Sequence, residues 1–328
     1  MGSKRVKLAD RLLERQAPSR PHRGEPKALA AGLFSFPTHG ATAGDLIACD
    51  VVCKWLAEAG LKYDVALAPP FIGGCDWRSV DPGDYSHVLW ICGPLGKHTE
   101  AFARMRRRFG GEPRRWIGVN LSMIDPVEEW NPFDVLLERD STRSGHADLG
   151  FRAHSTPVPV IGLVQVEPFT PLVPERDRQD DAREAARRVA YSTHAAVVEI
   201  DTRLDVANAS GLRTPAEVET LIARMDVIVT TRLHGLVLAL KHGVPAVAID
   251  PVAGGDKITA QGRVVDWPCA FAVDEASDQV LSEALAFALS ADGRSRAQAA
   301  AERGVQSVEV LREEFLDALA LERTRAGG

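Results

Sequence analysis

The stretch that decides the fold is DVIVTTRLHGLVLALKHGVPAVAID, residues 226–250. Its first part, residues 226–230, is an apolar, β-branched run that is typical of a buried strand. An apolar helical pattern begins at Leu233 and ends at Gly243 and Pro245, which are common helix stop signals. A second apolar run, residues 246–250, follows directly. A strand, a tight turn, a helix and another strand in this order predict an α/β fold with a parallel sheet.

The turn between the first strand and the helix carries polar side chains. We expect Thr230, Thr231, Arg232 and His234 at the carboxyl end of a parallel strand, where open α/β sheets bind their ligands. The free N–H groups and the positive dipole end of the helix favour an anion, and the planar guanidinium of Arg232 suits a carboxylate or a phosphate. Gly235 lies inside an apolar helix, which indicates a close approach of another group there.

This arrangement predicts an anion site at residues 230–235, with Arg232 or Lys257 as its basic contact. A second interpretation remains open at this point. An Arg and a His near a helix start more often act as surface or capping residues, and the turn alone names no reaction.

Strand-like and helix-like stretches alternate along the rest of the chain, which extends the α/β interpretation to the whole sequence. The length of 328 residues is enough for about two domains. We expect a basic arm at residues 1–27 and two Rossmann-like domains at residues 28–155 and 156–328, with the boundary in the Pro-punctuated stretch 154–159. Strands are expected at residues 28–35, 63–68, 87–92, 116–121, 133–137, 160–166, 195–200, 226–230 and 246–250, and helices at residues 45–59, 97–109, 177–192, 215–224, 233–242, 277–289 and 294–321.

The composition argues against several classes of protein. The 39 Lys and Arg residues against 45 Asp and Glu residues leave a net charge of −6, whereas a dedicated nucleic-acid binder needs a basic surplus. No apolar run approaches the ~20 residues of a membrane span, and the N-terminus lacks the apolar core of a signal peptide. The five Cys residues lack the paired spacing of a zinc site. We expect a soluble, cytoplasmic protein without a metal site, in which the basic arm offers at most a weak contact with an anionic membrane surface.

Residues 226–250 closely resemble the Arg-Leu-His-Gly core of the polysaccharide pyruvyltransferase family, through residues 232–235. A weaker resemblance extends from about residue 29 to about residue 275. Gly44-Asp45 resembles the family's Asn-x-Gly-Asp turn, and WICGPL at residues 90–95 resembles its Gly-rich strand end. ERDS at residues 138–141 resembles the Arg-Asp motif at the end of the family's first domain. Lys257 stands where the family often has Lys.

This resemblance implies a GT-B-like fold, in which two Rossmann-like domains face each other across a cleft and a C-terminal brace helix crosses back to the first. It implies an enzyme that transfers the enolpyruvyl unit of phosphoenolpyruvate onto two sugar hydroxyls of a cell-surface glycan or related glycoconjugate, forming a pyruvate ketal without a metal or cofactor. The implied site places His234 as the acid/base group, Arg232 and Lys257 as the anion clamp, Thr230, Thr231 and Gly235 beside the donor, and Gly44, Asp45 and Arg139 on the acceptor side or in the cleft.

Three departures from the family pattern leave the donor open. Thr42 replaces the family's Asn, the Gly triplet is reduced to Cys92-Gly93-Pro94, and residues 161–167 lack the Arg that family members tend to carry there. One alternative is a GT-B glycosyltransferase that uses a nucleotide sugar, because the same residues suit a nucleotide diphosphate. The other is a non-catalytic relative that binds a sugar or a nucleotide.

Overall fold

The computed structural model describes residues 24–326, except residues 39, 112–113, 141–142, 144, 166–173, 207 and 209, and it describes side chains up to residue 319. The chain divides into two compact units, Met1–Ser155 and Thr156–Gly328. The division falls in the Pro-punctuated stretch 154–159. Residues 1–23 of the predicted basic arm lie outside the described residues, and Lys27 is the first residue of a strand.

The first unit is built around one parallel sheet. Strand β1 lies between β2 and β3, and β5 pairs with β3, with β6 and with the short β4. The predicted strand at residues 28–35 ends early, because residues 33–35 turn into a short 3-10 helix. The elements are β1 (Lys27–Ala31), α2 (Ala43–Glu58), β2 (Lys62–Val65), β3 (His87–Ile91), β4 (Pro94–Leu95), α3 (Glu100–Phe109), β5 (Arg115–Met123) and β6 (Val135–Glu138), with 3-10 turns at Leu33–Ser35, Pro82–Asp84 and Leu149–Arg152.

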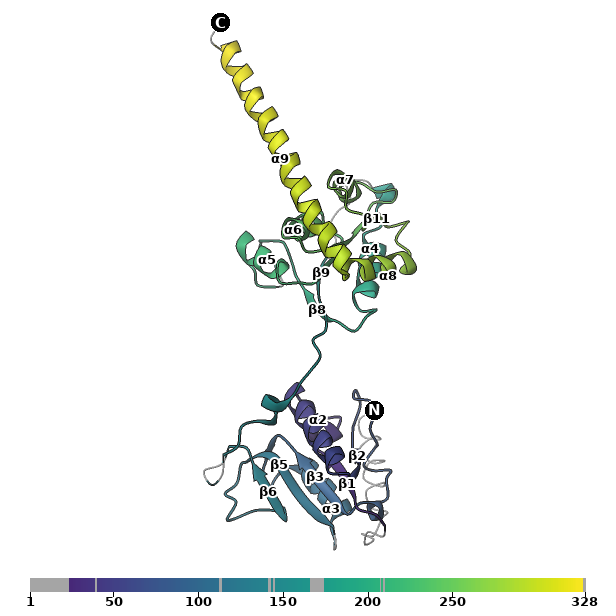
Figure 1. Cartoon of the computed structure of the whole chain (residues 1–328), viewed down its shortest axis with the longest axis vertical. Coiled ribbons are helices and arrows are strands. Elements are labelled where there is room, and N and C mark those ends of the chain that lie inside the picture. Colours follow the sequence, from purple (N-terminus) through teal and green to yellow (C-terminus); the bar gives the residue numbers. More distant parts are fainter. Residues whose placement is uncertain are drawn as a thin grey trace. The chain divides into compact units, whose positions relative to one another are not determined.

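Both faces of this first sheet are covered by helices. Because successive strand residues point to opposite faces, Ala28 and Ala30 pack on the side of α2, whereas Leu29 and Ala31 pack on the side of α3. The α3 side is aromatic, and the ring of Phe102 lies edge-on against those of Trp90 and Trp116. Figure 1 shows α2 alongside the strands of this sheet.

The second unit repeats the same topology. Its parallel sheet has the order β11-β10-β9-β7-β8, so its first strand again lies between the second and the third. The predicted α/β class with parallel sheets is therefore confirmed. The elements are β7 (Val160–Val164), a 3-10 turn at Pro174–Arg176, α4 (Gln179–Ala190), β8 (Ala196–Glu199), α5 (Pro215–Ile222), β9 (Val227–Thr230), α6 (Leu233–Lys241), β10 (Ala246–Asp250), α7 (Lys257–Val264), β11 (Ala270–Ala272), α8 (Asp278–Ala288) and α9 (Ala291–Ala326).

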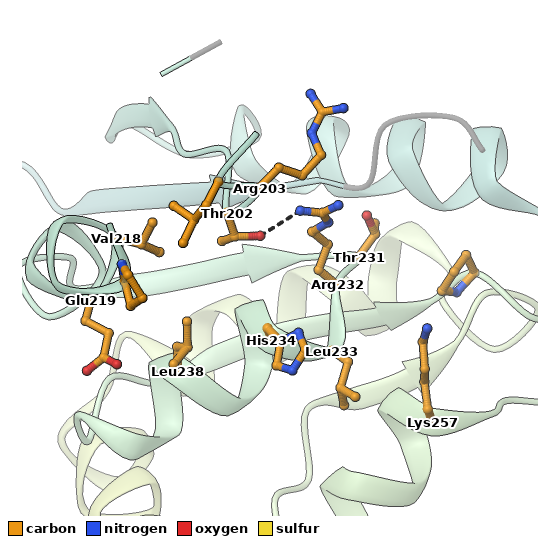
Figure 2. A pocket seen from close by; sticks show the side chains of 13 residues that line it. Thr202, Arg203, Val218, Glu219, Thr231, Arg232, Leu233, His234, Leu238 and Lys257 are labelled. Carbon is orange, nitrogen blue, oxygen red and sulfur yellow. Dashed lines mark hydrogen bonds between the residues drawn. The ribbon is translucent and has the colours of Figure 1, made fainter. Parts of the chain in front are cut away.

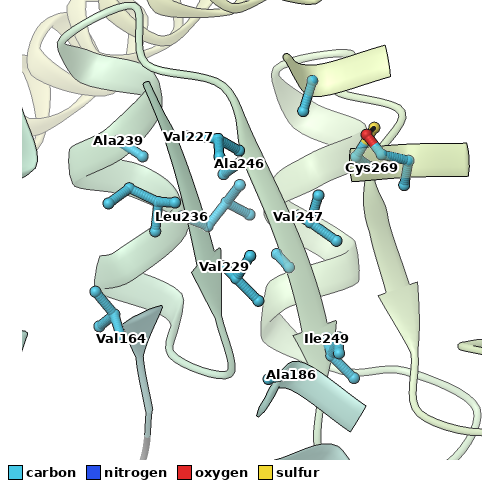
Figure 3. Packing of buried hydrophobic residues seen from close by; sticks show 14 of the residues in the cluster. Val164, Ala186, Val227, Val229, Leu236, Ala239, Ala246, Val247, Ile249 and Cys269 are labelled. Carbon is cyan, nitrogen blue, oxygen red and sulfur yellow. Dashed lines mark hydrogen bonds between the residues drawn. The ribbon is translucent and has the colours of Figure 1, made fainter. Parts of the chain in front are cut away.

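The core of the second unit is centred on β9, β10 and α6. Every residue of β9 and β10 is buried, which explains why both strands read as continuous apolar runs rather than alternating ones. Leu236 and Ala239 of α6 pack against this sheet, as Figure 3 shows. The apolar packing holds the β9–α6 turn in place at the carboxyl edge of the sheet.

Helix α9 begins in this core and leaves it. Ala297 and Ala300 are buried, whereas all side chains from Val305 to Leu319 are exposed. Figure 1 shows the second half of α9 extending past α6. The predicted packing of this helix as a brace stays a prediction. Among the described residues, no helix has the length and apolar character needed to cross a membrane.

Candidate functional site

A pocket of about 430 Å³ opens at the carboxyl edge of the second sheet. Residues that follow three strands of this sheet line it. Thr202, Arg203 and Leu204 follow β8, residues 231–234 follow β9, and Pro251 and Lys257 follow β10. Figure 2 shows these residues together with Pro215, Val218, Glu219 and Leu238 of the α5 and α6 helices. Ligands of open α/β sheets bind at this edge, near the point where the strand order reverses, which here is the β7–β9 pair.

The turn into α6 is fixed by residues that lie beneath the pocket. The Thr230 hydroxyl accepts a hydrogen bond from the Arg232 backbone N–H at 2.9 Å and donates one to the Arg232 carbonyl at 3.2 Å. A Cβ on Gly235 would lie 2.1 Å from that hydroxyl oxygen. The close approach that the sequence predicts at Gly235 is therefore present. Thr230 and Gly235 are both buried and do not line the pocket, so they shape the turn instead.

The start of α6 opens toward the pocket. Within the described part of the chain, no side chain caps this helix, whose N-cap residue is Arg232. The first N–H groups of an α-helix have no intrahelical acceptor, and here they belong to Leu233, His234 and Gly235. The His234 side chain is exposed and lines the pocket. Uncapped N–H groups at a helix start, beside an imidazole, form a site suited to an anion.

Arg232 is held by the loop after β8. Its Nη1 donates to the Thr202 hydroxyl at 2.8 Å, the dashed contact in Figure 2, and lies 3.8 Å from a carboxylate oxygen of Asp201. Asp201 also accepts from the guanidinium of Arg203 at 3.0 Å. The Asp201 carboxylate thus lies beside both guanidinium groups.

Lys257 brings a second basic group to the pocket from the start of α7. Figure 2 shows its side chain extending away from that helix, and Lys257 lines the pocket. Among the described residues, the Lys257 side chain has no hydrogen-bond or ion-pair partner, and it is exposed. Arg232, His234 and Lys257 thus line one cavity although β10 separates the last from the other two in sequence.

The other part of the pocket is apolar. Leu204, Pro215, Val218 and Leu238 form its wall. Glu219 stands at this wall, and its carboxylate accepts from the ammonium of Lys241 at 2.7 Å and contacts the His242 ring at 3.0 Å. Hydrogen bonds from these two side chains lower the pKa of Glu219. This pairing joins α5 to the end of α6.

The remaining predicted site residues lie in the first unit. Gly44 and Asp45 are at the start of α2, where the Asp45 carboxylate accepts from the backbone N–H of Thr42 at 2.7 Å and from its hydroxyl at 2.9 Å. Thr42 is thus the N-cap residue of α2, held by the Asp45 carboxylate. Arg139 follows β6 and donates to Asp148 at 2.8 Å and to the Ser122 hydroxyl at 2.6 Å.

A polar cluster surrounds Arg139 at the carboxyl edge of the first sheet. The side-chain amide of Asn120 donates to the same Asp148 oxygen at 3.1 Å. Burial alone raises the pKa of Asp148, but hydrogen bonds from Gly150, Arg139 and Asn120 outweigh it and lower the pKa below the ordinary value. Among the described residues, no group of three or more His, Cys, Asp or Glu side chains is placed to hold a metal ion.

Sequence reasoning missed the contributions of two loops. Asp201, Thr202 and Arg203 follow a predicted strand, and polar residues at the carboxyl end of a parallel strand are the signal that identifies such positions. Asp250 ends another predicted strand, and it holds the start of α7 in place. Nothing in the sequence marked the apolar wall as part of a site.

Comparison with known proteins supports the resemblance seen in the sequence. Residues 167–251 match the polysaccharide pyruvyl transferase family, so the predicted resemblance is confirmed over this segment, which contains the β9–α6 turn. No curated protein matches the chain.

Solved glycosyltransferases are similar at low identity. The spinosyn forosaminyltransferase SpnP is 16% identical, covers 89% of this chain and 99% of its own, and has a TM-score of 0.32. The glycotransferase of kitacinnamycin is 14% identical, covers 87% of this chain and 95% of its own, and has a TM-score of 0.30. The glycosyltransferase SsfS6 of Streptomyces sp. SF2575, solved with thymidine diphosphate, is 14% identical, covers 86% of this chain and 96% of its own, and has a TM-score of 0.27.

Proposed function

We propose that this chain is a transferase whose second unit binds phosphoenolpyruvate and whose reaction moves the enolpyruvyl unit onto two sugar hydroxyls of a glycan or glycoconjugate. The observation that carries the proposal is the convergence of Arg232, His234 and Lys257 on the open start of α6. The family match over residues 167–251 supports the reaction class.

Each of these groups has a chemical task in that reaction. Phosphoenolpyruvate carries a carboxylate and a phosphate, and the guanidinium, the ammonium and the helix N–H groups are suited to hold them. C3 of the donor takes up a proton and C2 becomes electrophilic. Two hydroxyl oxygens then bond to C2 as the bond between C2 and the bridging oxygen breaks. Of the two hydroxyl protons, one balances the proton taken up at C3 and the other leaves with the phosphate as hydrogen phosphate. His234 lines the pocket, and an imidazole can serve as general acid and as general base in such a reaction.

A second candidate function is favoured by the apolar wall. Beyond the basic residues, the cavity is lined by Leu204, Pro215, Val218 and Leu238. A nucleobase or another uncharged ring would pack against these side chains while a diphosphate occupies the start of α6. A glycosyltransferase that uses a nucleotide sugar has such a donor. The volume of about 430 Å³ lies within the range of ligand pockets, roughly 300–1,000 Å³, and leaves room for either donor.

The two candidates are separated by a binding measurement on the full chain. The melting temperature is recorded with phosphoenolpyruvate and with a panel of nucleoside diphosphates and nucleotide sugars, because a ligand that binds only the folded state raises it. We expect phosphoenolpyruvate to stabilise the protein and Arg232→Ala to remove the effect. Arg178→Ala, which changes a surface Arg that is paired with Asp181 outside this pocket, is the matched control.

Turnover is tested by phosphate release. Phosphoenolpyruvate is incubated with the protein and a panel of sugar acceptors, and released phosphate and the mass of the acceptor are measured. Acceptor-dependent phosphate release with a ketal product supports the first function. Stabilisation by nucleoside diphosphates but not by phosphoenolpyruvate replaces it with the second, and binding without turnover of any donor points to a binding protein.

A further inference from the structure

The carboxylate of Asp250 is buried at the end of β10 and holds the start of α7. Only 1% of the Asp250 surface is exposed. One of its oxygens accepts from the backbone N–H groups of Asp256 at 2.8 Å, Ile258 at 3.0 Å and Thr259 at 3.2 Å, and the other accepts from Val252 at 3.2 Å. Because a helix start carries N–H groups without intrahelical acceptors, this carboxylate occupies the position that a bound anion would take.

The loop that joins Asp250 to α7 is fixed at further points. Gly254 donates its N–H to Asp274 at 2.8 Å, and the Arg176 guanidinium donates to the carbonyls of Ala253 and Gly255. Gly255 has a φ of +79°, and a Cβ there would lie 2.5 Å from the Thr259 hydroxyl. A loop held in this way fixes where α7 begins.

The first residue of that helix is Lys257. Its backbone position follows directly from the hydrogen bonds that Asp250 makes on either side of it, to Asp256 and to Ile258. Its side chain lines the pocket at the start of α6. Helices α6 and α7 begin at the same sheet edge but differ in how their first N–H groups are satisfied. At α7 these groups donate to the Asp250 carboxylate, whereas no side chain among the described residues accepts from those of α6.

We propose that Asp250 is a positioning residue, which closes the start of α7 so that Lys257 is held over the pocket and binds the anionic group of a ligand lying at the start of α6. The inference rests on the proposed function, because it needs an anion in that pocket. It makes two separate predictions, one on backbone amides and one on coupling between side chains.

The amide prediction needs no substitution. In hydrogen exchange on the full chain, the amides of Asp256, Ile258 and Thr259 should exchange slowly without ligand. Their exchange rates should not change when phosphoenolpyruvate or inorganic phosphate is added. The amides of Leu233, His234 and Gly235 should gain protection. Ligand-induced protection at the start of α7, or rapid exchange there without ligand, would overturn the proposal.

The coupling prediction is a double-mutant cycle with Asp250→Asn and Lys257→Met. Asp250→Asn should weaken phosphoenolpyruvate binding roughly tenfold to a hundredfold, the loss of a charge-assisted contact. In the Lys257→Met background it should cause no further loss of affinity, although it should still lower the melting temperature. Asp226→Asn is the control and should leave affinity nearly unchanged, because the Asp226 carboxylate accepts from the backbone N–H of Val160 at 2.7 Å outside the pocket.

The outcomes separate this inference from the proposed function. If wild-type protein binds no anion, or if Arg232→Ala leaves binding intact, the proposed function fails. If binding depends on Arg232 while the losses from Asp250→Asn and Lys257→Met simply add, Asp250 does not act through Lys257 and the inference fails alone. Where Asp250→Asn does not fold, the hydrogen-exchange pattern decides.

Discussion

Replacing Gly235 by alanine tests the packing that shapes the site. The added Cβ would lie 2.1 Å from the Thr230 hydroxyl oxygen, 2.9 Å from its Cβ and 3.1 Å from a methyl of Val164. These neighbours are fully buried, and Thr230 belongs to a strand in the centre of the sheet. Thr230 cannot move aside without breaking the hydrogen bonds between its hydroxyl and the Arg232 backbone.

The expected magnitude follows from three contributions. Overpacking of a well-packed interior costs about 1–3 kcal/mol, and weakening the Thr230 hydroxyl bonds costs about 1 kcal/mol more. Alanine in place of glycine inside a helix returns about 1 kcal/mol. The free energy of unfolding should therefore fall by roughly 1–3 kcal/mol, which lowers the melting temperature of a unit of this size by about 3–10 °C.

Calorimetry of the full chain measures this effect, with Gly304→Ala as the matched control. Gly304 also lies inside a helix, α9, but the nearest atom to its added Cβ is a methyl of Val265 at 3.8 Å. The control should gain the helix propensity of alanine without a clash, and its melting temperature should rise slightly. If Gly235→Ala were as stable as Gly304→Ala, the close approach at the β9–α6 turn would not exist as described.

Three further predictions concern the chemistry and the first unit. His234→Asn should lower kcat by about 10²–10⁴-fold with an unchanged melting temperature and nearly unchanged donor affinity, measured by phosphate release and calorimetry, and full turnover would remove His234 from the mechanism. Arg232→Ala should also raise the donor KM, because it removes ground-state charge pairing, and a loss of kcat alone would contradict this. The pKa of Asp148 is lowered from 3.8, so its stabilising contribution is present above that pH and is lost as pH falls through the lower folded value. Below pH 4, the free energy of unfolding should therefore depend less on pH in Asp148→Asn than in the wild type, as denaturation measured at a series of pH values would show. Identical pH dependence in the two proteins would show that the hydrogen bonds of Asp148 do not contribute to stability.

The strands and helices with strong local patterns could be predicted from the sequence. The expected strand at residues 246–250 coincides with β10, and the expected helix at residues 233–242 is one residue longer than α6. These segments are buried, so their apolar periodicity reflects packing directly. The elements that were missed are short or weakly patterned. Helix α7 follows two glycines and mixes polar with apolar residues, and β11 has only three residues.

The candidate site could be predicted only where its signal is local. A tight strand-to-helix turn with an internal glycine identified Arg232 and His234, because the strand, the turn and the glycine are adjacent in sequence. The pocket itself combines loops after three different strands. Which polar residues of the loop after β8 meet Arg232 depends on strand order, and a single sequence does not encode that order in any local pattern.

The comparison of α6 with α7 explains why the pocket forms where it does. Both helices begin at the carboxyl edge of the same parallel sheet, and each begins with N–H groups that need acceptors. At α7 the chain supplies the acceptor itself, since one oxygen of Asp250 lies 2.8–3.2 Å from three backbone nitrogens. At α6 the corresponding position is lined by Arg232 and His234 and faces the cavity. On the proposed function, backbone N–H groups at the start of α6 would hold a carboxylate or phosphate as those of α7 hold Asp250, and Arg232 and His234 would lie beside it. A carboxylate placed at the N-cap of α6 by Arg232→Asp should give the first N–H groups of that helix an acceptor within the chain and abolish anion binding while preserving the fold.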